Sequence, residues 1–122
     1  MRSEFDTEKS IYLQIAESIE DDILNEIIEE ETQVPSTNQI AAMYRINPAT
    51  AAKGINMLVS EHILYKKRGI GMFVATGAVE KIRAKRKSAF YDKYVIPLSD
   101  EAASLGISKE ELLKMIEKSR NK

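Results

Sequence analysis

The sequence has no cysteine, a single histidine and no long apolar run, and each absence excludes a class of protein. Without cysteine there is no disulfide bond, no thiolate metal site and no cysteine nucleophile, which fits a reducing cytoplasm. His62 stands without partner ligands or a triad, so we interpret it as structural. No stretch approaches the roughly 18 apolar residues that span a bilayer. The first six residues carry acids, unlike a signal peptide. We expect a cytoplasmic protein that is not an enzyme and uses no cofactor or metal.

Size and composition indicate a small soluble protein. The 122 residues are 43% hydrophobic and 30% charged, which is ordinary for a globular chain. This length predicts one domain, or a small domain with an appendage. Because so short a chain buries only a modest fraction of its surface, a helix with an uncovered apolar stripe is expected to need a partner chain.

Charge is distributed unevenly, although the net charge is only −1. Residues 1–33 contain eleven acids and two bases, whereas residues 45–87 contain ten bases and two acids. We interpret the acidic block, including Asp21, Asp22 and residues 29–31, as solvated surface. Whether the basic block is solvated surface or binds nucleic acid depends on the motif in which its residues lie.

The first expected helix covers residues 11–28, about five turns. Isoleucines recur at every fourth position from Ile11 to Ile27, which makes one apolar stripe. The acids Glu17, Glu20, Asp21, Asp22 and Glu26 are expected largely outside this stripe. Residues 29–33 are expected to form a loop, and Pro35 prevents continuation.

Two short helices are expected next, separated by a turn at residues 45–47. Ser36 and Gln39 form a capping box for the first, and Asn47-Pro48 is a strong start signal for the second. Ala51, Ile55 and Leu58 make the inner face of the second helix, and Gly54 allows close helix approach. This arrangement is helix-turn-helix geometry. The outer face presents Ala49, Thr50, Lys53, Asn56 and Ser60.

A β-hairpin is expected after these helices. Residues 63–66 and 72–75 favour strands, and the intervening Lys67-Arg68-Gly69-Ile70-Gly71 supplies glycines for the turn. A basic hairpin directly after a helix-turn-helix is a wing. The fold class is therefore mainly α with a small β-hairpin wing.

The remainder is expected to form a helical module. A helix begins at Ala78 and is ended or kinked by Pro97, and Gly106 stops the next one. Ser108 and Glu111 form a capping box for the last helix. We predict a winged helix-turn-helix DNA-binding domain at residues 1–76 and a helical dimerisation module at residues 77–122.

The order and spacing of these motifs resemble the GntR family of bacterial regulators. The Asn-Pro-x-Thr turn and the short helical tail, with residues 105–111, are similar to the YtrA-like subfamily. The resemblance implies a winged helix-turn-helix followed by a small dimerisation module. The matching pieces are Pro35-Ser36, Ile40-Ala41, Asn47-Pro48-Ala49-Thr50, Leu58, Gly69-Ile70-Gly71 and Phe73-Val74, with Ile11-Tyr12-x-Gln14-Ile15 in the first helix.

Three departures from the family pattern reduce the expected number of DNA contacts. Asn38 stands where the family usually has arginine, Met72 follows the wing glycines in place of threonine, and Ala52 replaces a frequent basic residue. Lys53 is then the only charge on the outer face of the third helix. We therefore expect fewer base contacts than is usual in the family, or base contacts made by the wing in place of the third helix.

Three groups of residues are predicted to contact DNA. The N-terminal part of a recognition helix enters the major groove, a helix start offers N–H groups to phosphate, and a basic wing reaches phosphates or the minor groove. The basic cluster from Lys81 to Lys87 either neutralises phosphates or solvates its helix. The predicted DNA-binding residues are Ser36, Thr37, Asn38, Asn47, Ala49, Thr50, Lys53, Lys67, Arg68 and Gly69.

The tail is predicted to make a homodimer that presents two recognition helices to a pseudo-palindromic operator. Repression is the default expectation because an occupied promoter blocks polymerase, and the subfamily resemblance implies a transporter operon. The sequence leaves open whether a small-molecule effector binds at the dimer interface. The alternative is a winged-helix protein-interaction module without DNA binding. The predicted dimerisation residues are Ile82, Phe90, Tyr94, Leu112, Leu113 and Ile116.

Overall fold

The computed structural model describes residues 10–121, which excludes the first six residues discussed above. The chain divides into two compact units, Met1–Ala84 and Lys85–Lys122, called unit 1 and unit 2 below. The division lies within helix α4 (Ala78–Phe90), after the boundary expected at residues 76 and 77. The reason is that Ala78 and Ile82 are fully buried in the core of unit 1.

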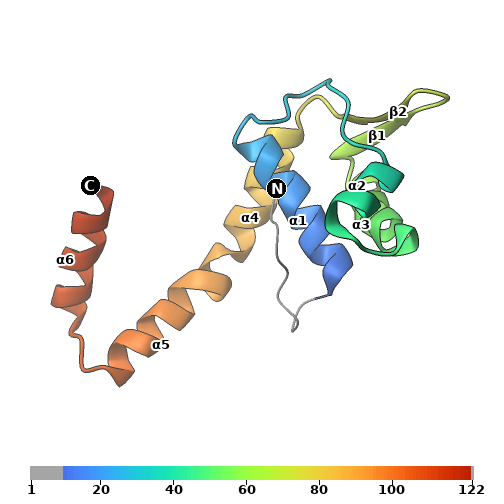
Figure 1. Cartoon of the computed structure of the whole chain (residues 1–122). Helices are drawn as coiled ribbons and strands as arrows, with labels where there is room; N and C mark the ends of the chain where they lie inside the picture. The colour runs from blue at the N-terminus through green and yellow to red at the C-terminus, as the bar shows by residue number, and fades with distance from the viewer. Residues whose placement is uncertain (1–9, 122) are drawn as a thin grey trace. The chain divides into compact units, whose positions relative to one another are not determined.

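Unit 1 contains the three helices predicted from the sequence: α1 (Ile11–Leu24), α2 (Thr37–Tyr44) and α3 (Pro48–Ser60) (Figure 1). The capping box of α2 is confirmed, because the backbone N–H of Gln39 donates to Ser36 Oγ at 3.1 Å and that of Ser36 donates to Gln39 Oε1 at 2.8 Å. The Ala49 N–H donates to Asn47 Oδ1 at 2.8 Å, and Pro48 takes the first helical position of α3. Local sequence therefore fixes where both helices begin.

The turn between α2 and α3 depends on a left-handed residue. Arg45, the C-cap of α2, has a φ of +55°, and the Ile46 N–H donates back to the carbonyl of Ala41 at 3.0 Å. Such a cap satisfies carbonyls at the helix end while it reverses the chain. The expected turn at residues 45–47 is confirmed.

The wing is a two-stranded antiparallel hairpin of β1 (Leu64–Lys67) and β2 (Gly71–Val74). The predicted hairpin is confirmed, and the strands expected at residues 63–66 and 72–75 each differ from the observed ones by one residue. Residues 31–34 lie along the other side of β2: the Val34 N–H donates to the carbonyl of Met72, and the Val74 N–H to that of Thr32, both at 3.0 Å. The loop before α2 is thus tied to the wing, which the sequence did not reveal.

The core of unit 1 joins α1, α2, α3, the hairpin and the start of α4. Gly54 lies against α1, where a Cβ would come within 2.7 Å of the carbonyl oxygen of Tyr12. Close approach of α1 and α3 therefore requires glycine, as expected. The completely buried apolar side chains include Ile15, Ile19, Ile23, Ile40, Ile55, Leu58, Val74 and Ile82.

Two expectations for α1 are wrong. The helix ends at Leu24, and Ile27 is 69% exposed, because the chain turns at Glu26 with a positive φ of 58°. Glu20 and Asp22 are buried instead of solvated, and both take part in polar interactions. Paired or hydrogen-bonded acids are the usual form in which carboxylates are buried.

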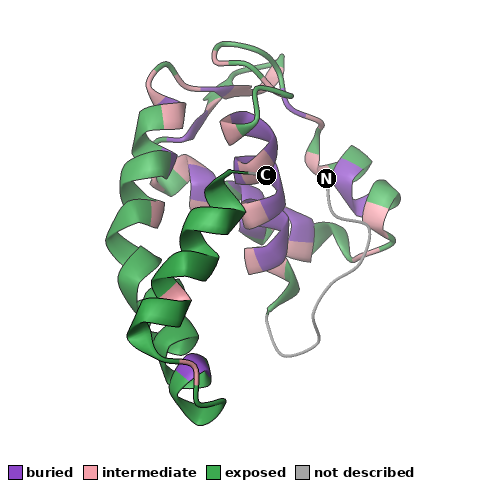
Figure 2. Cartoon of the chain, turned by 90° about the vertical axis from the view of Figure 1, so that its left-hand side faces the viewer, coloured by how far each residue is buried: buried purple, intermediate pink, exposed green. Residues whose placement is uncertain are grey.

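Unit 2 is helical and mostly exposed. After α4, a π-helical turn, η1 (Tyr91–Val95), leads into α5 (Ile96–Ser104), and α6 (Lys109–Arg120) follows. Pro97 has no N–H for the carbonyl four residues back, and the Ile96 N–H donates five residues back to Tyr91. Gly106 has a φ of +71° at the end of α5, and Ser108 caps α6 through the predicted capping box. In Figure 2 the buried colour gathers in unit 1, and Ala102 is the one buried residue among residues 85–121.

Candidate nucleic-acid interface

The outer face of α3 carries the predicted recognition residues. Asn47, Ala49 and Lys53 are exposed, and Thr50 is half-buried. The Lys53 ammonium lies 4.1 Å from the centroid of the Tyr12 ring on α1. A cation over an aromatic face is attracted to it, so Tyr12 restrains the lysine without removing its charge from the surface. Nothing in the sequence spacing linked Tyr12 to Lys53.

The start of α2 offers exposed polar groups. Ser36 and Asn38 are exposed and Thr37 is half-buried. Ser36 Oγ already accepts the Gln39 N–H, so this hydroxyl caps the helix. The first-turn N–H groups and the Asn38 amide remain suited to a phosphate oxygen.

The wing carries three exposed residues of the predicted set, Lys67, Arg68 and Gly69. The Lys67 ammonium lies 4.2 Å from the centroid of the Phe73 ring across the hairpin. Gln33 braces the wing tip, because its Nε2 donates to the carbonyl of Ile70 at 3.0 Å. A Cβ on Gly71 would lie 2.5 Å from Gln33 Nε2, and Gly71 has a φ of +146°. Gly71 therefore serves turn geometry, as expected, and its missing side chain also leaves room for Gln33.

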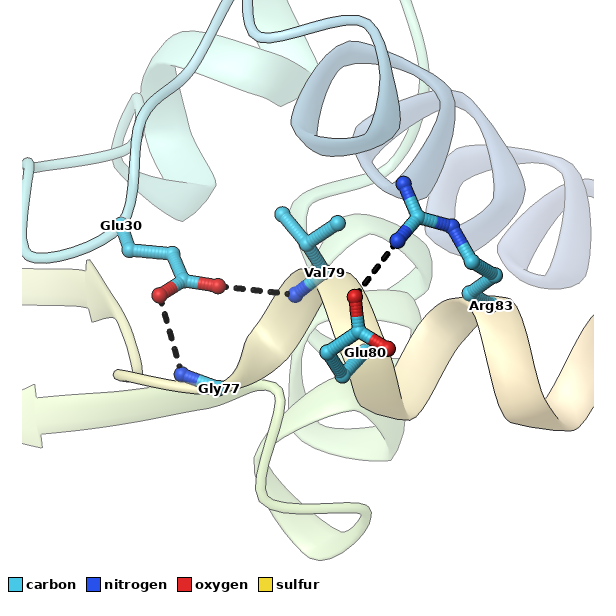
Figure 3. A network of polar contacts seen from close by, with 5 residues as sticks. All are labelled: Glu30, Gly77, Val79, Glu80 and Arg83. Carbon is cyan, nitrogen blue, oxygen red and sulfur yellow. Dashed lines mark hydrogen bonds and ion pairs between the residues drawn. The ribbon is translucent and has the colours of Figure 1, made fainter.

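Glu31 is exposed and Glu30 is partly exposed, in line with the solvated surface predicted, but both also accept hydrogen bonds that the sequence did not predict. Glu30 accepts the N–H groups of Gly77 and Val79, each at 3.0 Å, with one carboxylate oxygen for each (Figure 3). Glu31 accepts the Tyr65 hydroxyl, and it accepts the Thr76 N–H at 3.0 Å and the Thr76 hydroxyl at 2.7 Å. Both acids hold the segment that leads from the wing into α4.

These bonds shift the pKa values of the groups involved. The Gly77 and Val79 N–H groups lower the pKa of Glu30, because they stabilise the carboxylate. The Tyr65 and Thr76 hydroxyls lower the pKa of Glu31, and in turn the hydrogen bond to Glu31 raises the pKa of Tyr65. The acids therefore act in the ionised form.

Part of the basic cluster at residues 81–87 has intramolecular partners. Lys81 Nζ donates to the carbonyl of His62 at 3.1 Å, and Arg83 forms an ion pair with Glu80 in the same helix (Figure 3). Lys85 and Arg86 also take part in interactions within the molecule. Lys81, Arg83, Lys85 and Arg86 therefore all have partners within the molecule.

His62 has a structural role that involves its backbone. It is exposed, it follows α3 with a φ of +61°, and its carbonyl accepts Lys81. Within residues 10–121 no group of histidine and acidic side chains is arranged to hold a metal ion. Over the same residues, no helix is both long and apolar enough to cross a membrane.

The predicted dimerisation residues do not form one set. Ile82 is fully buried in the core of unit 1, so its assignment to a dimer interface is wrong: the start of α4 covers its own domain. Phe90 and Tyr94 are 55% and 54% exposed, with ring centroids 5.4 Å apart. Leu113 and Ile116 are exposed and Leu112 is half-buried. Within unit 2, α5 and α6 border an open apolar groove of about 440 Å³, lined by Leu98, Ala102, Leu105, Leu112, Met115 and Ile116 among others.

Known proteins resemble both the sequence and the structure. Residues 11–74 match the family model described as bacterial regulatory proteins, gntR family. The HTH-type transcriptional regulator YhcF of Bacillus subtilis is 28% identical over 118 residues, which cover 95% of this chain and 94% of YhcF. The matched residues of the family model include α1, α2, α3 and both strands of the wing.

Two solved structures extend the comparison. A putative transcriptional regulator of the GntR family from Bacteroides thetaiotaomicron is 40% identical, with a TM-score of 0.72 over 91% of this chain and 96% of that one. AraR(DBD) in complex with operator ORE1 is 28% identical, with a TM-score of 0.52 over 62% of this chain and 94% of that one. The likeness to the Bacteroides protein extends over most of both units, whereas AraR(DBD) matches a shorter part of the chain.

Proposed function

This chain belongs to the GntR family of bacterial regulatory proteins and is a DNA-binding transcriptional regulator, and from that premise we propose that it is a homodimeric repressor of a pseudo-palindromic operator. The observation that carries the proposal is the family match over the three helices and the wing, together with exposed Lys53 and Arg68 on that domain. The relatives are regulators and not enzymes, and family membership disfavours a docking module that does not bind DNA.

In this proposal α3 lies in the major groove. Asn47, Ala49, Thr50 and Lys53 are at its N-terminal, outward part, which is the part that contacts base edges in such domains. Lys53 supplies the cation of this face, and the Tyr12 ring limits its freedom. Base contacts specify the sequence here, and phosphate contacts elsewhere set the orientation.

The start of α2 and the wing supply the phosphate contacts. The exposed first turn at Ser36, Thr37 and Asn38 presents N–H groups to a phosphate oxygen. Lys67, Arg68 and Gly69 project from the hairpin, which Gln33 and Phe73 hold in place. A basic hairpin in this position reaches phosphates or the minor groove.

Unit 2 supplies the homodimer contacts. Among its described residues only Ala102 is buried, so unit 2 does not cover its own apolar side chains. The exposed ones include Phe90, Tyr94, Leu113 and Ile116. A second copy supplies the missing surface, and two-fold pairing of like patches is the commonest solution. The open apolar groove between α5 and α6 is the candidate site for a small-molecule effector. In this proposal the regulator acts in the cytoplasm, at the promoter of a transporter operon.

A gel shift with the DNA upstream of the gene tests the proposal. Lys53→Ala and Arg68→Ala should each weaken binding by about 1–3 kcal/mol where the side chain reads a base, and less where it meets only phosphate. Both side chains are exposed, so the melting temperature should stay nearly constant. Lys118→Ala, which removes an exposed cation from α6, is the matched control and should not change affinity. Unchanged affinity in both wing and helix variants would contradict this interface.

A further inference from the structure

One lysine supplies the charge on the outer face of α3. Among Ala49, Thr50, Lys53, Asn56 and Ser60, which make up this face, Lys53 is the only charged residue. A lysine ammonium is a compact charge on a flexible four-carbon stem, so it reaches several neighbouring acceptors unless its position is restricted. Base recognition by α3 therefore depends on where this one ammonium is held.

The Tyr12 ring restricts the position of this ammonium. The ammonium nitrogen of Lys53 lies 4.1 Å from the ring centroid, a distance at which an aromatic face attracts a cation. Lys53 is exposed, whereas Tyr12 is half-buried. An ammonium has three N–H donors, so contact with a ring on one side leaves other donors for a base acceptor. Lys53 can therefore keep its contact with the ring and still donate to DNA.

Helix packing fixes the ring relative to Lys53. Gly54, the next residue of α3, lies so close to α1 that a Cβ would come within 2.7 Å of the Tyr12 carbonyl oxygen and 3.2 Å of Ile15 Cγ2. Ile15 and Ile55, from the same two helices, are completely buried in one core. Because the two backbones are held together at this level, the ring is a fixed support for the lysine.

The wing repeats this arrangement. The Lys67 ammonium on β1 lies 4.2 Å from the centroid of the Phe73 ring on β2. Lys53 and Lys67 are the two lysines of the predicted DNA-binding set, and each lies over a ring that another element supplies. The repetition supports a role for the rings in the interface. It also provides a matched comparison, because a change at one ring should not affect the base that the other lysine contacts.

We propose that Tyr12 is a positioning residue that restricts the Lys53 ammonium to one base pair and so sharpens the sequence preference of the regulator. The inference rests on the proposed placement of α3 in the major groove. A side chain that is already restrained loses less conformational freedom on binding, and it reaches fewer alternative acceptors. Loss of the ring should therefore reduce discrimination between base pairs more than it reduces attraction to DNA of any sequence.

Four substitutions test this role in the full chain. Tyr12→Leu removes the ring and keeps an apolar side chain, with Tyr12→Met in its place if that variant does not fold. Tyr12→Phe keeps the ring without the hydroxyl. Lys53→Met removes the charge, and its combination with Tyr12→Leu completes a double-mutant cycle. Phe73→Leu is the matched control, because it removes the ring beside the wing lysine.

The DNA site is obtained by in vitro selection with the wild-type protein, and each of its base pairs is then replaced singly. Affinities are measured by fluorescence anisotropy at a single salt concentration. At the base pair that Lys53 reads, the wild-type chain should discriminate by about 5- to 100-fold, and Lys53→Met should lose this preference. Tyr12→Leu should lower the discrimination there by about two- to fivefold, with no further effect in the Lys53→Met chain.

The controls should retain this discrimination. Tyr12→Phe preserves the face that attracts the cation, and Phe73→Leu leaves the Tyr12 ring in place. For unrelated DNA, the affinity of Tyr12→Leu should stay within about twofold of wild type, since the lysine keeps its charge. Equal loss of discrimination in Tyr12→Phe would assign the effect to the hydroxyl, and equal loss in Phe73→Leu would assign it to the domain as a whole. Either result overturns the role of the ring.

The remaining outcomes separate this inference from the proposed function. A wild-type chain that does not prefer the selected site to unrelated DNA overturns operator binding and the inference with it. If Lys53→Met retains discrimination at every base pair, Lys53 reads no base, and the inference fails while operator binding stands. If only Lys53→Met loses discrimination, or if Tyr12→Leu still acts in the Lys53→Met chain, Tyr12 does not act by positioning Lys53.

Discussion

Unit 1 and unit 2 contain similar apolar side chains but use them in opposite ways. In unit 1, isoleucines from α1, α2, α3 and α4 are fully buried together, with the wing closing one edge of the core. In unit 2, Phe90, Leu98 and Leu113 keep about half of their surface exposed. Apolar composition alone therefore does not identify a core. The number of elements that converge on one point decides whether a unit encloses its own side chains.

The largest effect expected from this comparison concerns salt. If unit 1 holds all the DNA-contacting charge, a homodimer with roughly 6–10 phosphate contacts should lose about 10³–10⁵ of its operator affinity between about 50 and 200 mM salt. A monomeric unit 1 on one half-site should show about half the slope of log affinity against log salt. Fluorescence anisotropy over a salt series measures both. A full-length slope clearly more than twice that of unit 1 would place DNA contacts in unit 2.

Removing unit 2 should give the next largest effect. Truncation after Ala84 keeps Ala78 and Ile82, which the core of unit 1 requires. The shortened chain should be a folded monomer that binds the full operator about 10²–10⁴ more weakly, because its twin no longer raises the local concentration. Sedimentation velocity at matched concentrations gives the oligomeric state. A truncated chain that still dimerises would show that the interface lies in unit 1.

Matched core and surface truncations compare the two units directly. Ile55→Ala removes a completely buried side chain and should lower the free energy of unfolding of unit 1 by about 2–5 kcal/mol. Leu113→Ala, at 51% exposure, should leave unit 1 unchanged and instead weaken self-association. Chemical denaturation and sedimentation equilibrium report the two quantities. If Leu113→Ala changes neither, α6 has no part in pairing.

The smallest expected effect depends on pH and concerns the attachment of α4. Because hydrogen bonds lower the pKa of Glu30 and Glu31 below the ordinary 4.5, their contribution to stability is present above that pH and is lost as pH falls through the lower folded pKa. The melting temperature of wild type should therefore exceed that of Glu31→Gln near neutral pH, and the gap should narrow below about pH 4. Thermal melts from about pH 7 to about pH 3 measure the gap. A constant gap would show that these carboxylates do not gain stability from their bonds.

Features encoded within a few residues were predictable from the sequence. The capping boxes at Ser36 and Ser108, the Asn47-Pro48 start and the glycine-containing wing turn all follow from neighbouring residues, and the structure contains each of them. The outer face of α3, which is predicted to contact DNA, followed from helical periodicity. These features positioned the candidate DNA surface before any tertiary contact was known.

Features that depend on contacts between distant residues were not predictable. Glu30 bonds Val79 across 49 positions of sequence, and no local pattern marks that pairing. Ile82 was assigned to the wrong interface because periodicity shows that a side chain is apolar but not which surface covers it. The burial of Glu20 and Asp22 has the same origin, since a helix face becomes interior only when another segment packs on it.

The π-helical turn at Tyr91–Val95 has a consequence for the phase of unit 2. It behaves like a one-residue insertion that the backbone has absorbed without leaving the helix. Each residue of an α-helix advances the side-chain direction by about 100°, so the extra residue sets the angular phase of α5 back by about that amount from the phase that residues 85–90 would predict. A single helical periodicity therefore does not run through residues 91–95. Side chains spaced three or four residues apart across the turn do not lie on one face of the helix. Deleting one residue between 91 and 95 would restore a common phase and realign Phe90 with a different set of α5 side chains.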